Sequence, residues 1–234
     1  SAGSGAWRAT ESSTTAATVR VRPSNTCTSI CSAAEISAGR QADKKDHINI
    51  QEMFILAKTY TMEIAGVKRE LPLCPVSDKL DIAAFILFGD VEVTVKAAEE
   101  LLKKCPEFDY ILTPEAKSIP LAYEMSRQSG KKYFVARKKP KVYMTDPVCV
   151  SVRSITTDAE QTLLLGREDG DQLRGKKVLI VDDVISTGES LAAVVALADK
   201  FDANIVAKAA VLAEGDAAER DDIVFLEKLP LFFK

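Results

Sequence analysis

Two adjacent carboxylates, Asp182 and Asp183, stand shortly before a turn built from hydroxyl residues and a glycine, Ser186-Thr187-Gly188-Glu189-Ser190. An ionised carboxylate only accepts hydrogen bonds, so an adjacent pair suits either two ribose hydroxyls or a phosphate-bound magnesium ion. A glycine turn that leads into a helix points backbone N–H groups at one spot, which attracts an anion such as a phosphate. Together the two halves predict a sugar phosphate, with its hydroxyls on the aspartates and its phosphate on residues 186–190.

The flanking segments indicate how the chain positions these residues. Residues 178–181 are a short, β-branched-rich apolar run, typical of a buried strand in a parallel sheet. From Leu191 the chain is rich in helix formers, so a helix is expected there. The Ser186-x-x-Glu189 spacing also suits a capping box at its start. A strand–turn–helix that binds no ligand is the alternative interpretation.

The rest of the chain alternates predicted strands and helices, which indicates a parallel α/β sheet whose ligands lie beyond the carboxyl ends of its strands. The expected elements are a helix from residue 48 toward 65, a loop over 71–80, a helix over 93–104, a strand–loop–helix unit over 108–130, a strand over 131–139, two strands of a hairpin-like arm at 147–154 and 160–166, and strands over 203–214 and 222–232.

Two further groups of charged residues follow predicted strands. The loop over residues 113–118 lies between a strand and a helix, which makes it a second candidate anion site, and it carries Lys117. Arg137, Lys138, Lys139 and Lys141 cluster where another strand leads into the arm, residues 142–165. Solvated surface charges are the alternative interpretation for both groups.

The pattern around Asp182 and Asp183 resembles the phosphoribosyl-diphosphate (PRPP) motif of the type I phosphoribosyltransferases. That motif is an apolar strand, two acidic residues, two small or apolar residues, and a small-Thr-Gly-x-Ser/Thr turn. Glu189 departs from it, since many members have a second glycine there, but a contact through its backbone N–H survives the change. Residues 115–118 are similar to the pyrophosphate loop of the purine enzymes, where a non-proline cis peptide often occurs, here near Ala116–Lys117. The resemblance covers nearly all of residues 48–234 and is closest to the purine branch that contains the adenine phosphoribosyltransferases.

The resemblance implies a fold, a reaction and a set of site residues. The fold would be an α/β, parallel-sheet type I phosphoribosyltransferase fold with a flexible arm and a small hood. Asp182, Asp183 and Lys117 would be catalytic, and the two aspartates would also be candidate ligands for Mg²⁺. The residues expected to bind PRPP are Asp182, Asp183, Val184, Ile185, Ser186, Thr187, Gly188, Glu189, Ser190, Ala116, Lys117, Arg137 and Lys141. Residues 138–165 would close as a lid, because water would trap the cationic sugar that forms as pyrophosphate leaves.

The identity of the acceptor base depends on a departure from the adenine enzymes. Those enzymes have a Ser-x-x-Leu-Glu-Tyr-Gly-like stretch in the arm, whose glutamate assists protonation of the purine. Here residues 154–158 are Ser-Ile-Thr-Thr-Asp, the nearest acids are Asp158 and Glu160, and the Ser-x-Thr pattern leans toward the xanthine enzymes. Adenine is the favoured base and xanthine the next.

Composition excludes several other classes of function. The formal net charge is −3, which argues against nucleic acid as a partner, and the longest apolar runs are too short to span a bilayer. Five cysteines without a Cys-x-x-Cys pair argue against a disulfide framework and favour a reducing compartment. The single histidine, His47, excludes a histidine-rich metal site.

Residues 1–42 differ from the remainder, residues 43–234, which form the predicted phosphoribosyltransferase domain. They are rich in alanine, serine and threonine, lack lysine and aspartate, and show no periodicity, so a disordered leader is expected. The segment is similar to an organellar transit peptide or is merely an upstream tail. The location is therefore expected to be cytoplasmic, or organellar if the segment is a genuine transit peptide.

The leading hypothesis is a purine phosphoribosyltransferase of purine salvage, which converts a purine base and PRPP to a nucleoside monophosphate and pyrophosphate. The alternative is a non-catalytic PRPP-sensing regulator on the same fold. Such regulators typically add a DNA-binding helical domain, whereas this chain has an acidic balance and keeps basic residues for pyrophosphate. An orotate or pyrimidine enzyme fits the purine-type second loop less well. A homodimer is implied by the resemblance alone.

Overall fold

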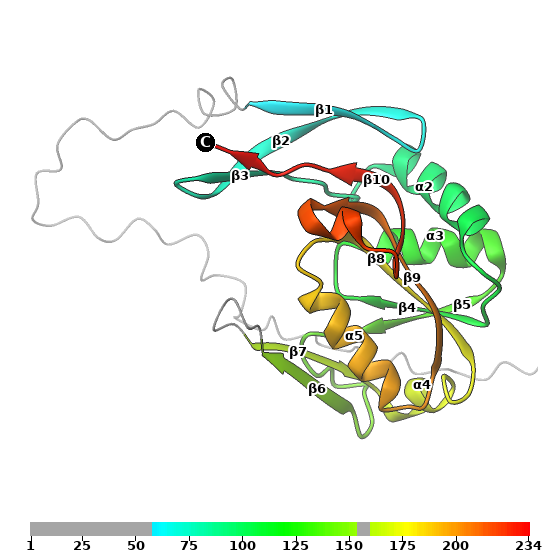
Figure 1. Ribbon diagram of the computed structural model, residues 1–234. Coiled ribbons are helices and arrows are strands. Elements are labelled where there is room, and N and C mark those ends of the chain that lie inside the picture. The colour runs from blue at the N-terminus through cyan, green and yellow to red at the C-terminus, as the bar shows by residue number, and fades with distance from the viewer. Residues whose placement is uncertain (1–57, 154–159) are drawn as a thin grey trace, which may run out of the picture. The chain divides into compact units, whose positions relative to one another are not determined.

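A five-stranded parallel sheet forms the centre of the computed structural model, which describes residues 58–153 and 160–234. Its spatial order is β10-β9-β8-β4-β5 (Figure 1). The strands are β4 (Tyr110–Pro114), β5 (Lys132–Ala136), β8 (Lys177–Ile185), β9 (Asn204–Glu214) and β10 (Val224–Leu229). All neighbouring pairs are parallel, which confirms the predicted sheet. β8 occupies the middle, so residues 178–183 are buried on both faces.

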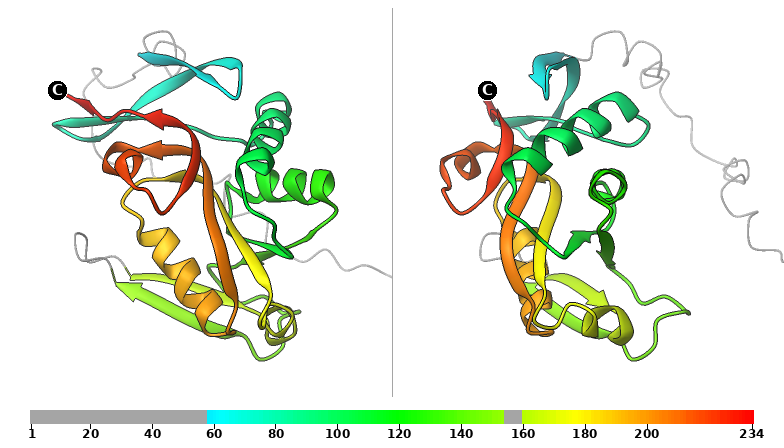
Figure 2. Two further views of the ribbon diagram at one scale, coloured as in Figure 1. Left: turned by 45° about the vertical axis from the view of Figure 1, so that its right-hand side comes forward. Right: turned by 90° about the vertical axis from the view of Figure 1, so that its right-hand side faces the viewer.

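Helices cover both faces of this sheet, and the alternation of side chains along β8 shows how the core divides. Leu179 and Val181 pack into the core shared with α2 (Val91–Lys104) and α3 (Ile119–Ser129), which contact each other on one face (Figure 2). Val178 and Ile180 pack into the core of the other face with α5 (Glu189–Asp199). This period of two is the geometry of a strand with two buried faces. The predicted helices over 93–104 and from Leu191 are confirmed.

The predicted arm is an antiparallel hairpin of β6 (Val148–Arg153) and β7 (Glu160–Leu165). Both strands pack against α5, and the leucines at the end of β7 are buried. The base of the arm is therefore part of the core. The lid predicted over residues 138–165 thus includes buried leucines at one end, and its closure stays a prediction. The short helix α4 (Arg167–Asp171) follows.

A second, antiparallel sheet forms the hood, in the order β1-β2-β3-β11 (Figure 1). Its strands are β1 (Thr59–Ile64), β2 (Val67–Ser77), β3 (Leu80–Ala83) and β11 (Phe232–Phe233). The helix expected toward residue 65 is wrong over β1, which pairs with β2 instead. The reason is the turn between them: Ala65 and Gly66 both have positive φ, 51° and 78°, as a tight two-residue hairpin requires.

Two other predictions about the hood are wrong. The loop expected over residues 71–80 lies mostly within β2, where a register shift between Pro75 and Ser77 accommodates the second proline. The single strand expected over residues 222–232 is two strands in different sheets. β10 ends before Pro230, and the chain then crosses to the hood, where β11 pairs with β3. The short η1 helix (Gly215–Glu219) precedes β10.

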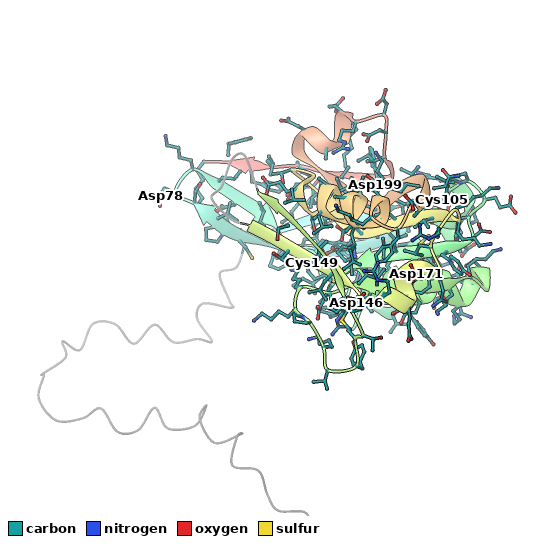
Figure 3. The ribbon with its side chains drawn as sticks, turned by 90° about the horizontal axis from the view of Figure 1, so that it is seen from below. Asp78, Cys105, Asp146, Cys149, Asp171 and Asp199 are labelled. Carbon is teal, nitrogen blue, oxygen red and sulfur yellow. The ribbon has the colours of Figure 1, made fainter. Side chains whose placement is uncertain are left out.

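Several sequence predictions fall partly or wholly outside the described residues. These are the leader over residues 1–42, His47 and Asp158. Within the described ranges the cysteines Cys74, Cys105 and Cys149 are free thiols, and Figure 3 shows Cys105 and Cys149 on separate parts of the ribbon. None of the described helices is both long and apolar enough to cross a membrane.

Candidate functional site

The acidic pair lies near the carboxyl end of β8, and both side chains are buried. Successive side chains of a strand point to opposite faces, and the two aspartates have different surroundings accordingly. Asp182 lines a small cavity beside the turn, and its Oδ1 accepts the N–H of Asp183 at 2.9 Å. Asp183 is instead paired through Oδ2 with the ammonium of Lys117 at 2.9 Å. Burial, and then the negative charge of Asp183, raise the pKa of Asp182.

The turn at residues 186–190 begins a helix, but the predicted capping box is wrong. α5 begins at Glu189, and its N-cap is Gly188 with a φ of 82° and no side-chain cap. Ser186 lies too far upstream to cap the helix, so N–H groups of the first turn, such as those of Ser190 and Leu191, have no acceptor within the helix. They face a cavity of about 100 Å³ lined by Asp182 and residues 184–191. The predicted PRPP residues Val184 and Ile185 therefore belong to this cavity too.

A side chain at Gly188 would require the end of the Arg220 side chain to move. A Cβ built there would lie 2.7 Å from Nη1 of Arg220, whose guanidinium otherwise donates from Nε and Nη2 to Asp222. Arg220 thus places a cation next to the turn. Sequence analysis did not identify it, because thirty-odd residues and a whole strand separate it from the motif.

The loop after β4 is fixed to β8 by buried hydroxyls. The hydroxyl of Thr113 lies 2.8 Å from the carbonyl oxygen of Val181 and 2.8 Å from the hydroxyl of Ser118. Ser118 in turn donates to the carbonyl of Pro114 at 2.9 Å. The cis peptide expected near Ala116–Lys117 is one bond earlier, at Glu115–Ala116. These bonds tie the loop to the residue directly before Asp182, which brings Lys117 to the acidic pair.

The basic residues at the end of β5 are only partly brought to this site. Arg137 pairs its guanidinium Nη2 with Oε1 of Glu115 at 3.3 Å, so it contacts the loop that carries Lys117. Its backbone also exchanges hydrogen bonds with Leu164, which joins β5 to the arm. Lys141 is half-buried and makes no ion pair with any residue that the structure describes. Lys138 and Lys139 are exposed.

A larger cavity of about 330 Å³ lies between the hood and the carboxyl edge of the sheet. Its walls are residues 82–86, directly after or within β3, together with Lys117, Val184, Ser186, Glu214 and Leu229. Glu214 is the last residue of β9 and is half-buried. Burial raises the pKa of its carboxyl, and the charge of Lys117 partly offsets this. Sequence analysis missed Glu214, although an acid at the carboxyl end of a predicted parallel strand was a usable signal.

The acidic pair is the candidate site for a metal ion. No group of three or more histidine, cysteine or acidic side chains gathers anywhere in the described ranges. Asp182 and Asp183 supply oxygen ligands, and the raised pKa of Asp182 shows a buried carboxyl that a cation would stabilise in its charged form. Mg²⁺ is commonly bound by one or two carboxylates plus substrate phosphates, so these residues fit it.

Comparisons with known proteins agree with this geometry. The family model described as "Phosphoribosyl transferase domain" matches residues 92–230. The hypoxanthine/guanine phosphoribosyltransferase of Methanococcus voltae is 32% identical over 146 residues, which cover 62% of this chain and 72% of that protein. The purine biosynthesis transcriptional repressor PurR of Bacillus subtilis is 31% identical over 113 residues, 48% of this chain but 39% of the repressor.

A solved structure extends the likeness to the fold. The adenine phosphoribosyltransferase of Thermoanaerobacter pseudethanolicus superimposes with a TM-score of 0.51 at 18% identity, covering 76% of this chain and 99% of that one. The predicted resemblance to the type I phosphoribosyltransferases and their purine branch is thereby confirmed. The chain belongs to the phosphoribosyl transferase domain family.

Proposed function

We propose that this protein is a purine phosphoribosyltransferase, which transfers the 5-phosphoribosyl group of PRPP to a purine base and releases pyrophosphate. The observation that carries the proposal is the ion pair between Lys117 and Asp183 at the carboxyl edge of the sheet. It joins a loop suited to pyrophosphate to an acidic pair suited to ribose, beside a helix N-terminus suited to the 5′-phosphate. The cavity under the hood offers the base a place next to all three.

Each group has a separate task in this reaction. Backbone N–H groups at the start of α5 hold the 5′-phosphate, since the helix dipole favours an anion there. Lys117 meets the charge that grows on the leaving pyrophosphate. Asp182 and Asp183 stabilise the positive charge that develops on the ribose as the C1–oxygen bond breaks. When bound by the aspartates, Mg²⁺ supplies charge neutralisation to the diphosphate.

The proposed acceptor base rests on the sequence of the arm. Adenine is the favoured base and xanthine the next, on the pattern at residues 154–158, which lie outside the described residues. The relatives named above include an adenine enzyme and a hypoxanthine/guanine enzyme. A cytoplasmic homodimer is part of the same proposal.

Pyrophosphate release tests the proposal directly. The purified protein is mixed with PRPP and Mg²⁺ and with adenine, hypoxanthine, guanine, xanthine or uracil in turn. We expect release with at least one purine and none with uracil. Asp182→Asn, which keeps the size of the side chain, serves as the inactive control. Release with uracil alone would contradict the proposal.

A PRPP-sensing regulator is the second candidate, favoured by the similarity to PurR. It would bind PRPP at the same turn but release no pyrophosphate with any base. Calorimetric titration with PRPP, beside the release assay, separates the two: binding without turnover supports the regulator, and binding with turnover supports the enzyme.

A further inference from the structure

The cavity under the hood contains one acidic side chain, that of Glu214. Ile82, Phe85, Ile86, Val184 and Leu229 make most of the wall apolar. The other polar side chains of the wall are engaged elsewhere: Lys117 pairs with Asp183, and Ser186 also belongs to the turn before α5. A base that enters this cavity therefore meets one polar group that is not already committed to the phosphate end of the site.

The carboxyl of Glu214 has no partner among the described residues. It forms no hydrogen bond and no ion pair there, although it is half-buried. Burial raises the pKa of Glu214, as expected for a carboxyl that loses water without gaining a donor, and the nearby ammonium of Lys117 works in the opposite direction. A half-buried carboxyl has lost part of its hydration, so a ligand that donates an N–H to it supplies a hydrogen bond that the folded protein does not.

The backbone fixes where this carboxyl lies. Glu214 is opposite Leu229 in the parallel pairing of β9 and β10, and Leu229 is buried in the same wall. Gly215, the next residue, has a φ of 58° and begins η1, so β9 ends at Glu214. The side chain is thus presented from the end of a rigid strand, which suits a selective contact better than a loop would.

We propose that Glu214 determines which base this protein accepts, and that it selects purines with an exocyclic amino group, adenine or guanine, over hypoxanthine. The inference rests on the proposed function. An ionised carboxylate accepts hydrogen bonds but cannot donate one, so it pairs with the exocyclic amino group that adenine carries at C6 and guanine at C2 and that hypoxanthine lacks. Sites built to bond a substrate N–H reject an analogue that lacks it more strongly than apolar pockets reject a missing methylene.

The conservative variant Glu214→Gln is the sharpest probe, because it keeps the size of the side chain and exchanges the acceptor-only carboxylate for an amide that also donates. We measure kcat/KM for adenine, guanine and hypoxanthine at saturating PRPP. The wild-type protein should prefer adenine or guanine to hypoxanthine, and the variant should shift that ratio toward hypoxanthine roughly tenfold or more. The KM for PRPP should stay the same. Asp216→Asn is the matched control, since Asp216 is exposed, two residues away and outside the cavity wall.

A binding measurement keeps the inference separate from catalysis. Calorimetric titration of the wild type, Glu214→Gln and Asp216→Asn with AMP, GMP and IMP needs no turnover. Loss of an AMP or GMP preference in Glu214→Gln alone supports the inference, even if no base is converted and the proposed reaction fails. Equal preferences in the wild type and Glu214→Gln overturn it, whether or not pyrophosphate is released, and so does a wild type that binds none of the three nucleotides.

Discussion

The turn after β8 and the loop after β4 lie at the same edge of the sheet, but they offer an anion different groups. The turn presents backbone N–H groups from an uncapped helix start, with Gly188 in the left-handed region. The loop presents the side chain of Lys117, held against Asp183 by a framework of buried hydroxyls. Anion binding at the turn should depend on backbone geometry and little on side-chain identity. Anion binding at the loop should depend on the charge of Lys117.

The largest expected effect is the loss of PRPP binding when a side chain is added at Gly188. Gly188→Val should abolish measurable PRPP binding, a loss of at least about 100-fold, because Gly188 has a positive φ that valine rarely adopts and because the new side chain would block close approach of the phosphate and displace the end of Arg220. Gly130→Val is the matched control: Gly130 also has a positive φ, but nothing lies within 4 Å of its Cβ position. Calorimetry with PRPP and a melting curve for both variants separate lost binding from backbone strain. Equal PRPP affinities in the two variants would disprove a close approach at Gly188.

Removing the charge of Asp182 or Asp183 should lower kcat more than it lowers the affinity for PRPP. Asp182→Asn and Asp183→Asn should each lower kcat about 100-fold, because the aspartates oppose a positive charge that exists only as the bond to pyrophosphate breaks. The affinity for PRPP should fall much less. Single-turnover kinetics together with PRPP titration measure both. An unchanged kcat in either variant would show that this residue does not stabilise the positive charge on the ribose.

Lys117→Ala tests whether the loop after β4 binds pyrophosphate through the side chain of Lys117. It should weaken pyrophosphate binding by about 1–3 kcal/mol, the loss of one charge-assisted contact. It also leaves Asp183 buried beside Asp182 without a cation, so the protein should melt at a lower temperature. The double variant with Asp183→Asn should recover the melting temperature but not the pyrophosphate affinity. Lys96→Ala, which removes an exposed lysine from α2, should change neither quantity.

The pH dependence of stability should reveal the buried charge of Asp182. Its pKa is higher in the folded protein than in the unfolded chain, so the folded form binds more protons between the two values, and stability falls as the pH rises through that interval. Each unit of pKa difference between the folded and unfolded states changes the free energy of unfolding by about 1.4 kcal/mol. Asp182→Asn should therefore melt higher than the wild type at pH 8, with a smaller gap near pH 4. An equal difference in melting temperature between the two proteins at every pH in that range would contradict a raised pKa.

The smallest effect should come from a side chain of the turn itself. Thr187 is exposed, and the proposed phosphate contacts are made by the backbone. Thr187→Ala should change the PRPP affinity by about twofold or less, in contrast to Lys117→Ala. A loss as large as that of Lys117→Ala would remove the distinction between the two loops.

Sequence analysis predicted correctly the parts of the fold that are determined by a local sequence pattern or by the repeated alternation of strands and helices. The apolar run of β8 with its aspartates and glycine identified the central strand, and the pattern around Lys117 identified the second loop. β1 was wrong because its short sequence fits a helix as well as a strand, and only pairing with β2 decides between them. Glu214 was missed because its cavity is made by β3, β9 and β10 together, so no local pattern marks it.

The pairing of β11 with β3 has a consequence for the order of events during synthesis. Lys234 donates its N–H to the carbonyl of Lys79 and its ammonium bonds Asp81, so the hood is sealed by residues from the opposite end of the described chain. Strands β4, β5 and β8 emerge from the ribosome far earlier and can pair without it. A nascent chain thus contains both anion-binding loops before it contains Glu214 and Leu229, two residues of the wall of the cavity under the hood. The selection between bases that we propose for Glu214 would therefore need residues that follow both anion-binding loops in the chain.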